Sequence, residues 1–149
     1  MAIRHLLFEA GGLALAAPAE LISSVHEQLR VQPVSGTQRW FRGLAVAHGK
    51  LLPVTDLGAF SGRRSSTGHT LELTESIGKG GLQVDTVFGL SATPLSEVPL
   101  DQEDAVFSSD GNLALTTQAV VQQDRVHRLL DIAALLQSPV FLNIAETDN

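Results

Sequence analysis

The sequence predicts a mainly β protein that folds as a barrel or a pair of barrels. Short apolar segments recur along the chain with glycine, proline and polar residues between them, and few segments have a helical pattern. The length of 149 residues suits one domain, which we place at residues 1–149. An apolar strand, an aspartate and a short apolar helix follow one another twice, in LLPVTDLGAF and HRLLDIAALL. This repeat suggests two similar subdomains.

The first half of the chain predicts two hairpins, because a short glycine-containing turn separates apolar strands in each case. They comprise residues 3–8 with 13–17 around Gly11-Gly12, and residues 44–47 with 50–54 around His48-Gly49. Between the hairpins, residues 19–28 predict one helical turn followed by extended chain. Residues 61–69 are polar and predict a loop.

The second half of the chain predicts further strands. A glycine-rich turn at residues 78–81 follows a strand at 71–73 and precedes a second strand that begins at Leu82, which indicates another hairpin. An acidic segment with two prolines, residues 91–109, comes next. The last two strands are expected at residues 113–121 and 124–130.

Two short helices are expected where an aspartate follows an apolar strand. Asp56 and Asp131 would each lie at a helix N-terminus. There a carboxylate accepts hydrogen bonds from free backbone amides and contributes about 0.5–2 kcal/mol. Glycines at 58 and 62 limit the first helix, and Ser138-Pro139 ends the second.

The composition excludes several classes of protein. The absence of cysteine removes disulfides, thiolate catalysis and cysteine-based zinc sites. The net charge of −6 argues against a nucleic-acid partner, which needs a basic face. No apolar run reaches the roughly 20 residues that cross a bilayer. Because Glu9 and the double glycine interrupt the apolar N-terminus, we expect a cytoplasmic protein without a signal peptide.

Charge is segregated along the chain. Residues 30–64 carry several arginines and a lysine with Asp56 as the one acid, whereas residues 91–124 carry acidic side chains and no basic one. Two solvated faces of opposite sign would account for this pattern. Complementarity to partners would account for it as well, and would set the rate and orientation of encounter more than affinity.

Candidate catalytic and metal-binding groups are sparse. No two of the five histidines have the H-x-x-x-H spacing that places two ligands on one helix face. A metal site would have to gather its ligands from distant parts of the chain, and neither a metal nor a cofactor is expected. Asp56, Asp85 and Asp131 lie beside apolar strands, where two carboxylates close together could form a hydrolytic pair. Capping of helices and turns is the favoured interpretation, and an enzyme that uses Asp56 and Asp85 is the alternative.

Residues 43–57, GLAVAHGKLLPVTDL, have the spacing G-L-x-x-x-x-G-x-x-x-P-V-x-D-L. This segment resembles the signature of the CheW-like family, the adaptors of bacterial chemotaxis arrays. Three further blocks resemble the family in the same order along the chain, namely LLFEAGGLALAAPAELISSV, GLQVDTVFGL and VHRLLDIAALL. Four blocks in the right order are much more specific than any one of them.

The resemblance implies two intertwined five-stranded barrel subdomains, a hydrophobic groove between them and a short C-terminal helix. We place the subdomains at residues 1–66 and 67–138, with the C-terminal segment packing back on them. It also implies an adaptor without catalytic activity. One surface would bind the regulatory domain of a CheA-type histidine kinase. Another, including the groove, would bind the cytoplasmic tip of a methyl-accepting receptor in a membrane-associated array.

The signature turn departs from the family at two positions. The family usually has N-L-R-G there, whereas this chain has Val46 and His48 in the places of Asn and Arg, before Gly49. The arginine belongs to the receptor-facing part of the family's surface, so its loss puts receptor coupling in question. The chain is similar in this respect to divergent adaptors such as PilI or ChpC of pilus-linked chemosensory systems. A decoy that binds kinase without receptor control is a further alternative.

The side chains expected to contact partners are mostly apolar, and some of them are expected to prove part of the core. On the side of the first subdomain they are Ile22, Val25, Gly43, Val46, His48 and Gly49, and on the side of the second they are Leu82, Val84 and Val87.

Overall fold

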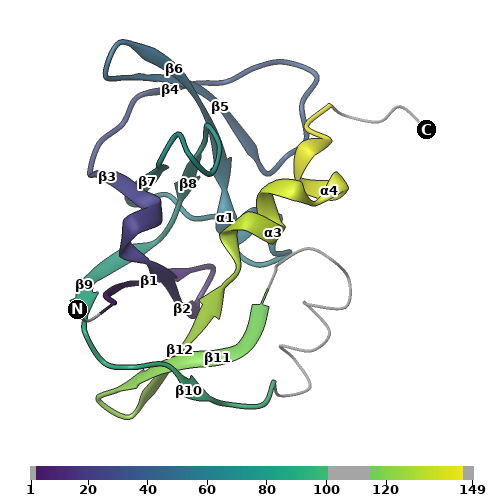
Figure 1. Ribbon diagram of the computed structural model, residues 1–149. Helices are drawn as coiled ribbons and strands as arrows, with labels where there is room; N and C mark the ends of the chain where they lie inside the picture. Colours follow the sequence, from purple (N-terminus) through teal and green to yellow (C-terminus); the bar gives the residue numbers. More distant parts are fainter. Residues whose placement is uncertain (1–2, 101–114, 146–149) are drawn as a thin grey trace.

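The computed structural model describes residues 3–100 and 115–145, which form two β-sheets with a few short helices (Figure 1). The first sheet has the order β10-β11-β12-β2-β1-β9, with β1 (His5–Ala10), β2 (Leu13–Pro18), β9 (Thr86–Ser91), β10 (Ser96–Glu97), β11 (Leu115–Gln122) and β12 (Arg125–Leu130). The second has the order β3-β7-β8-β6-β5-β4, with β3 (Ile22–His26), β4 (Val31–Gln32), β5 (Phe41–Ala47), β6 (Lys50–Asp56), β7 (Thr70–Leu73) and β8 (Gly81–Gln83). The predicted mainly β fold class is confirmed.

The number of strands differs from the five expected for each subdomain. Within the described residues each sheet has six strands, and the edge strands β10 and β4 are only two residues long. Such short edge pairings leave no periodic signal in the sequence. Residues 113–114, the expected start of β11, and residues 101–109 of the acidic segment lie outside the described residues.

Each sheet combines chain segments from both sides of residue 66. The N-terminal hairpin β1–β2 joins strands β9 to β12, and β7 and β8 join strands β3 to β6. Two parallel pairings, β2 with β12 and β6 with β8, and two antiparallel ones, β1 with β9 and β3 with β7, make these connections. The sheets are therefore intertwined and do not correspond to consecutive halves of the chain. Parallel neighbours need distant segments, so local sequence patterns do not specify them.

The predicted hairpins are present, and three hairpins of the described residues have turns with the backbone twist that tight hairpins need. A two-residue turn of this kind requires positive φ at both central residues. The described residues contain three such pairs, namely Gly11 and Gly12 (58° and 84°), His48 and Gly49 (51° and 75°), and Gln123 and Asp124 (52° and 61°). His48 thus adopts a left-handed conformation that is uncommon for residues other than glycine, although asparagine, aspartate and histidine adopt it more often than most.

Both expected aspartate caps are present. The side chain of Asp56 accepts a hydrogen bond from the Ala59 amide at the start of α1 (Leu57–Phe60). Asp131 does the same with the Ala134 amide at the start of α3 (Ile132–Gln137). A short 3₁₀ helix, η1 (Ala19–Leu21), leads into β3 as the expected helical turn. After α3 the chain becomes extended at Ser138, before a proline, and then forms α4 (Pro139–Leu142).

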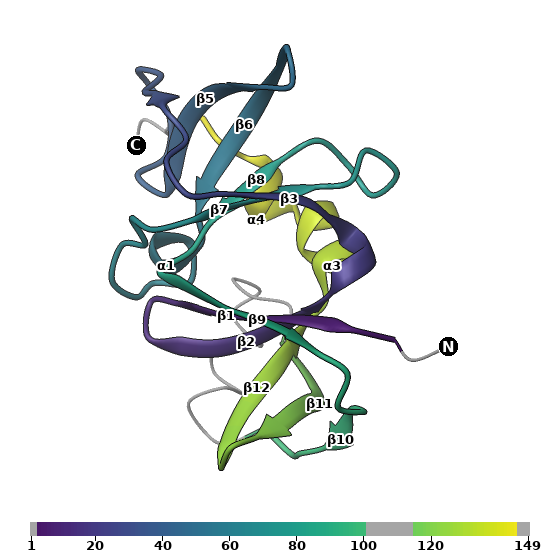
Figure 2. The same ribbon diagram turned by 90° about the vertical axis from the view of Figure 1, so that its left-hand side faces the viewer.

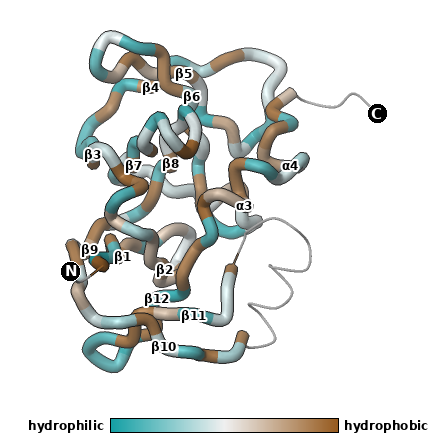
Figure 3. The backbone as a smooth tube through the Cα atoms, viewed as in Figure 1, coloured by the Kyte–Doolittle hydropathy of each residue, from teal (hydrophilic) through white to brown (hydrophobic). Residues whose placement is uncertain are grey.

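One main hydrophobic core connects the two sheets and the helices. Its fully buried side chains come from both sheets and from α1 and α3, and they include Phe8, Leu15, Leu57, Leu82, Leu130 and Ile132. Figure 3 shows the corresponding apolar residues along strands of both sheets and along α3. Because the core is shared, the sheets stabilise one another.

The C-terminal segment lies against the residues that precede β5. The indole ring of Trp40 stacks on Phe141 of α4, with ring centroids 6.1 Å apart, and meets Phe60 of α1 edge-on at 4.9 Å. The Gln38 amide donates to the carbonyl of Ile144 at 2.6 Å. Aromatic contacts of this kind add about 0.5–1.5 kcal/mol each beyond their buried area.

The β5–β6 and β11–β12 hairpins project from opposite ends of the molecule (Figure 2). No helix in the described residues is long and apolar enough to cross a membrane.

Two buried histidines should make the fold less stable in mild acid. Burial lowers the pKa of His5, and burial together with Arg125 lowers the pKa of His127. The unfolded chain therefore binds more protons than the folded one below the usual histidine pKa of about 6.5. Stability from these groups is complete above that pH and is lost as the pH falls through their folded-state pKa values. We expect the thermal unfolding midpoint to drop between about pH 7.5 and about pH 5.5.

The control is the double variant His5→Leu, His127→Phe. The Nδ1 atoms of both rings are buried without a hydrogen-bond partner, so apolar replacements leave no donor newly unsatisfied. The midpoint of the double variant should change less over the same pH range. An equal drop in both proteins would assign the acid sensitivity to other groups.

Candidate partner-binding surface

The tip of the β5–β6 hairpin presents two large apolar side chains to solvent. Val46 and Leu51 lie directly opposite each other in the register of the hairpin. They are 64% and 61% exposed. The tight turn at His48 and Gly49 holds them beyond the body of the second sheet, where no core residue covers them. Cross-strand apolar pairs are usually packed against something, so this pair is a candidate contact for another molecule.

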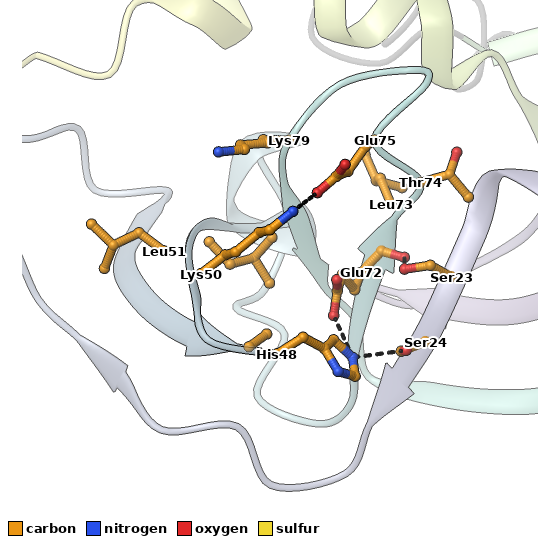
Figure 4. A pocket seen from close by; sticks show the side chains of 12 residues that line it. Ser23, Ser24, His48, Lys50, Leu51, Glu72, Leu73, Thr74, Glu75 and Lys79 are labelled. Carbon is orange, nitrogen blue, oxygen red and sulfur yellow. Dashed lines mark hydrogen bonds and ion pairs between the residues drawn. The ribbon is translucent and has the colours of Figure 1, made fainter.

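A pocket of about 320 Å³ lies beside the hairpin tip (Figure 4). Its walls come from three segments that are distant in the sequence, residues 23–24, residues 47–52 and residues 72–79. The rim is polar. Lys50 donates a 2.6 Å hydrogen bond to Glu75, which raises the pKa of Lys50 and lowers the pKa of Glu75. Both groups are on the surface, so the pair contributes little to stability.

The other expected contact residues of the first subdomain have different exposures. Val25 is 40% exposed on β3, whereas Ile22 on the same strand is half-buried and packs against the main core. Nothing lies within 4 Å of a side chain at Gly49, so this position is open. Val25, Val46, His48 and Gly49 therefore lie where a partner can reach them.

Four further expected contact residues are buried or half-buried and support the fold. Leu82 and Val84 are fully buried in the main core, so they offer no side-chain surface to a partner. Gly43 is buried beneath Gln32, whose carbonyl oxygen would lie 2.1 Å from a Cβ at this position. Val87 is half-buried against the core. The side chain of an apolar strand residue can point toward the core or toward solvent. At these positions the sequence alone does not distinguish the two.

A second apolar surface lies on the first sheet and was not expected from the sequence. Phe88 and Leu90 of β9 are 48% and 57% exposed, on the face opposite Val87. The guanidinium of Arg125 lies 5.1 Å from the centre of the Phe88 ring, and His127 meets that ring edge-on. A pocket of about 330 Å³ adjoins them. The run Val87-Phe88-Gly89-Leu90 has no polar residue on either face of the strand. This pattern is the one sequence signal that could have indicated an exposed apolar surface here.

The two aspartates of the enzyme alternative have separate structural roles. Asp56 is buried and accepts from the amides of Ala59 and Ser66, from the Ser65 hydroxyl, and from Arg42 at 2.6 Å. The contacts with Ala59, Ser65 and Ser66 fix α1 and the loop that follows it, and Arg42 joins this network from β5.

Asp85 is held elsewhere. It accepts from the backbone amide of Gly12 at 3.2 Å, and Arg64 lies 3.6 Å away. The carboxylates therefore cap a helix and a turn, as favoured from the sequence. Their contacts give no support to a hydrolytic pair.

Comparisons with known proteins agree with this architecture. The profile of the CheW-like domain family matches residues 4–140. Protein PilI of Pseudomonas aeruginosa is 32% identical over 92 residues, which cover 59% of this chain and 52% of that protein. The chain thus spans about half the length of this curated relative.

A solved structure has the same fold. The scaffolding protein TtCheW from Thermoanaerobacter tengcongensis superposes with a TM-score of 0.64 at 16% identity, over 88% of this chain and 90% of that one. The family's members are scaffolds without catalytic activity, which excludes the enzyme alternative. The chain belongs to the CheW-like domain family.

Proposed function

We propose that this chain couples a methyl-accepting receptor to a CheA-type histidine kinase in a cytoplasmic array at the membrane. The similarity to Protein PilI favours a pilus-linked system over a flagellar one. The observation that carries the proposal is the exposed apolar pair Val46 and Leu51, because it lies within the segment that resembles the family signature. Apolar side chains with a polar rim are typical of a protein-binding surface.

Two surfaces suit a protein that bridges two partners. The Val46–Leu51 surface lies on the second sheet, and the Phe88–Leu90 surface lies on the first. In the family, a receptor-facing arginine stands where this chain has His48. We therefore assign the hairpin surface to the receptor. The Phe88–Leu90 surface is then assigned to the regulatory domain of the kinase.

A calorimetric titration of each partner against two double variants tests this assignment. Val46→Ser with Leu51→Ser should weaken receptor binding by about tenfold or more and leave kinase binding unchanged. Phe88→Ser with Leu90→Ser should have the opposite effect. Val34→Ser, which removes a 40% exposed side chain elsewhere, is the matched control and should change neither affinity. If neither partner binds the folded wild-type chain, the proposal fails.

The decoy alternative has one observation in its favour. The side chain of His48 turns toward Ser24 and Glu72, with its Nε2 atom 3.3 Å and 3.5 Å from their oxygens. It is thus engaged within this chain, in a place where the family has an arginine. A decoy would bind the kinase domain and not the receptor, and His48→Arg would restore receptor binding. Receptor binding by the wild-type chain would reject the decoy.

A further inference from the structure

We propose that His26, His48 and Glu72 form a binding site for a divalent transition-metal ion, with zinc as the best match. The Nε2 atom of His26 lies 2.8 Å from Oε1 of Glu72, and the Nε2 atom of His48 lies 3.5 Å from the same oxygen. One ligand atom from each residue lies within 4.8 Å of the others. Two imidazole nitrogens and one carboxylate oxygen therefore converge on a single point.

The fold brings these residues together from three separate strands or turns. His26 is on β3, and Glu72 is on the adjacent β7, two residue pairs away in the register. His48 comes from the turn of the β5–β6 hairpin, and in the strand order β5 and β3 are separated by three other strands. The second sheet curves enough for Ser24 of β3 to lie 3.3 Å from the His48 ring.

The spacing of the ligand atoms suits zinc. Bonds of about 2.0–2.1 Å to nitrogen and oxygen in a tetrahedron place neighbouring ligand atoms about 3.3 Å apart. The His48–Glu72 separation is already close to this value, and the His26–Glu72 separation would need to widen by about 0.5 Å. Two histidines and a glutamate are also a known zinc ligand set, and they leave a fourth position open.

The burial of the three side chains differs in a way that suits metal entry. His26 and Glu72 are only 21% and 16% exposed, so they form the fixed part of the site. His48 is 65% exposed and can turn toward an ion that arrives from solvent. Since His48, Glu72 and Ser24 all line the pocket beside the hairpin, the open position would face that pocket. Water or a carboxylate of a bound partner could occupy it.

A bound ion would join the hairpin turn to β3 and β7. This link would restrain the tip that carries Val46 and Leu51, adding to the contacts that His48 makes with Ser24 and His26 of β3 and with Glu72 of β7. Zinc would then stabilise the folded chain, because an ion that binds only the folded state shifts unfolding by mass action.

The experiment is a titration of chelator-treated full-length protein with Zn²⁺ by calorimetry and with Co²⁺ by visible absorption. We expect one ion per chain and the intense absorption of tetrahedral Co²⁺. His26→Gln, His48→Asn and Glu72→Gln should each weaken binding by at least about 100-fold, since even the loss of an outer partner of a ligand costs 10–100-fold. Asparagine is chosen at 48 because it tolerates positive φ.

Glu75→Gln is the matched control. Glu75 lines the same pocket but pairs with Lys50 at 2.6 Å and takes no part in the cluster. It should bind zinc as the wild type does. Failure of the folded wild type to bind zinc at micromolar concentration would overturn the proposal. Equal losses in Glu75→Gln and Glu72→Gln would also overturn it. Should a ligand variant unfold, the wild-type stoichiometry and Co²⁺ spectrum still decide.

Discussion

Replacing Gly43 with alanine should destabilise the protein by about 3–5 kcal/mol, enough to unfold much of a marginally stable domain. A Cβ at this position would lie 2.1 Å from the carbonyl oxygen of Gln32 and 2.9 Å from the Cα of Pro33. These are backbone atoms, so no side-chain movement relieves the overlap. The φ angle of 137° is also one that residues with a Cβ rarely adopt. Strand β4 would have to separate from β5.

The matched control is Gly36→Ala. Gly36 also has a positive φ, 76°, but nothing lies within 4 Å of a side chain placed there. Its substitution should cost about 1 kcal/mol, the conformational term alone. Chemical denaturation of the two variants and the wild type measures the difference. Similar free energies of unfolding for both variants would show that β4 moves away at little cost, and that the close approach at Gly43 is unimportant.

The hairpins and caps could be predicted because each depends on residues close in the sequence. The pair His48-Gly49 sets the twist of one turn, and Asp56 and Asp131 satisfy amides three residues ahead. The strand order could not be predicted in this way. The parallel pairing of Leu15 with Arg128 joins residues from nearly opposite ends of the chain. The intertwined architecture could be predicted from the resemblance to the family, but not from local sequence patterns.

The candidate surfaces were only partly predictable for a related reason. Val46 was identified because it lies in the signature turn, and it is exposed. Leu82 and Val84 are expected at the surface as apolar strand residues, yet both are fully buried in the core that the two sheets share. Which face of a strand is covered depends on its neighbours in the sheet, and those neighbours are distant in sequence.

The cluster of His26, His48 and Glu72 shows the same limit most clearly. The spacing of metal ligands is diagnostic when one helix or one tight loop supplies them. Here His26 and Glu72 are 46 positions apart, and the curvature of the second sheet brings His48 to them. A search for local spacing therefore finds no site, although the sequence contains every ligand.

Replacing Asp56 with alanine is expected to cost about 3 kcal/mol or more, because its carboxylate is only 3% exposed and joins several groups. It would leave the buried Ser66 amide, a 2.8 Å donor to Oδ1, without a partner, and also the Ala59 amide at 3.0 Å. The guanidinium of Arg42 would lose its 2.6 Å contact but keep Gln83 at 2.8 Å. Asparagine should recover only part of the loss, since it lacks the charge that Arg42 pairs with.

Asp131→Ala is the control that measures the contribution of helix capping without the other contacts of Asp56. Asp131 has the same position relative to α3 and accepts from the Ala134 amide at the same 3.0 Å. It is exposed, and within the described residues the Ala134 amide is the one donor to its carboxylate. Its loss should therefore cost about 1 kcal/mol, the value of a helix cap. Guanidinium unfolding of both variants measures the excess at Asp56, which is the contribution of Arg42 and the 65–66 loop. If the two substitutions cost the same, Asp56 acts as a cap alone, and the loop that follows α1 does not depend on it.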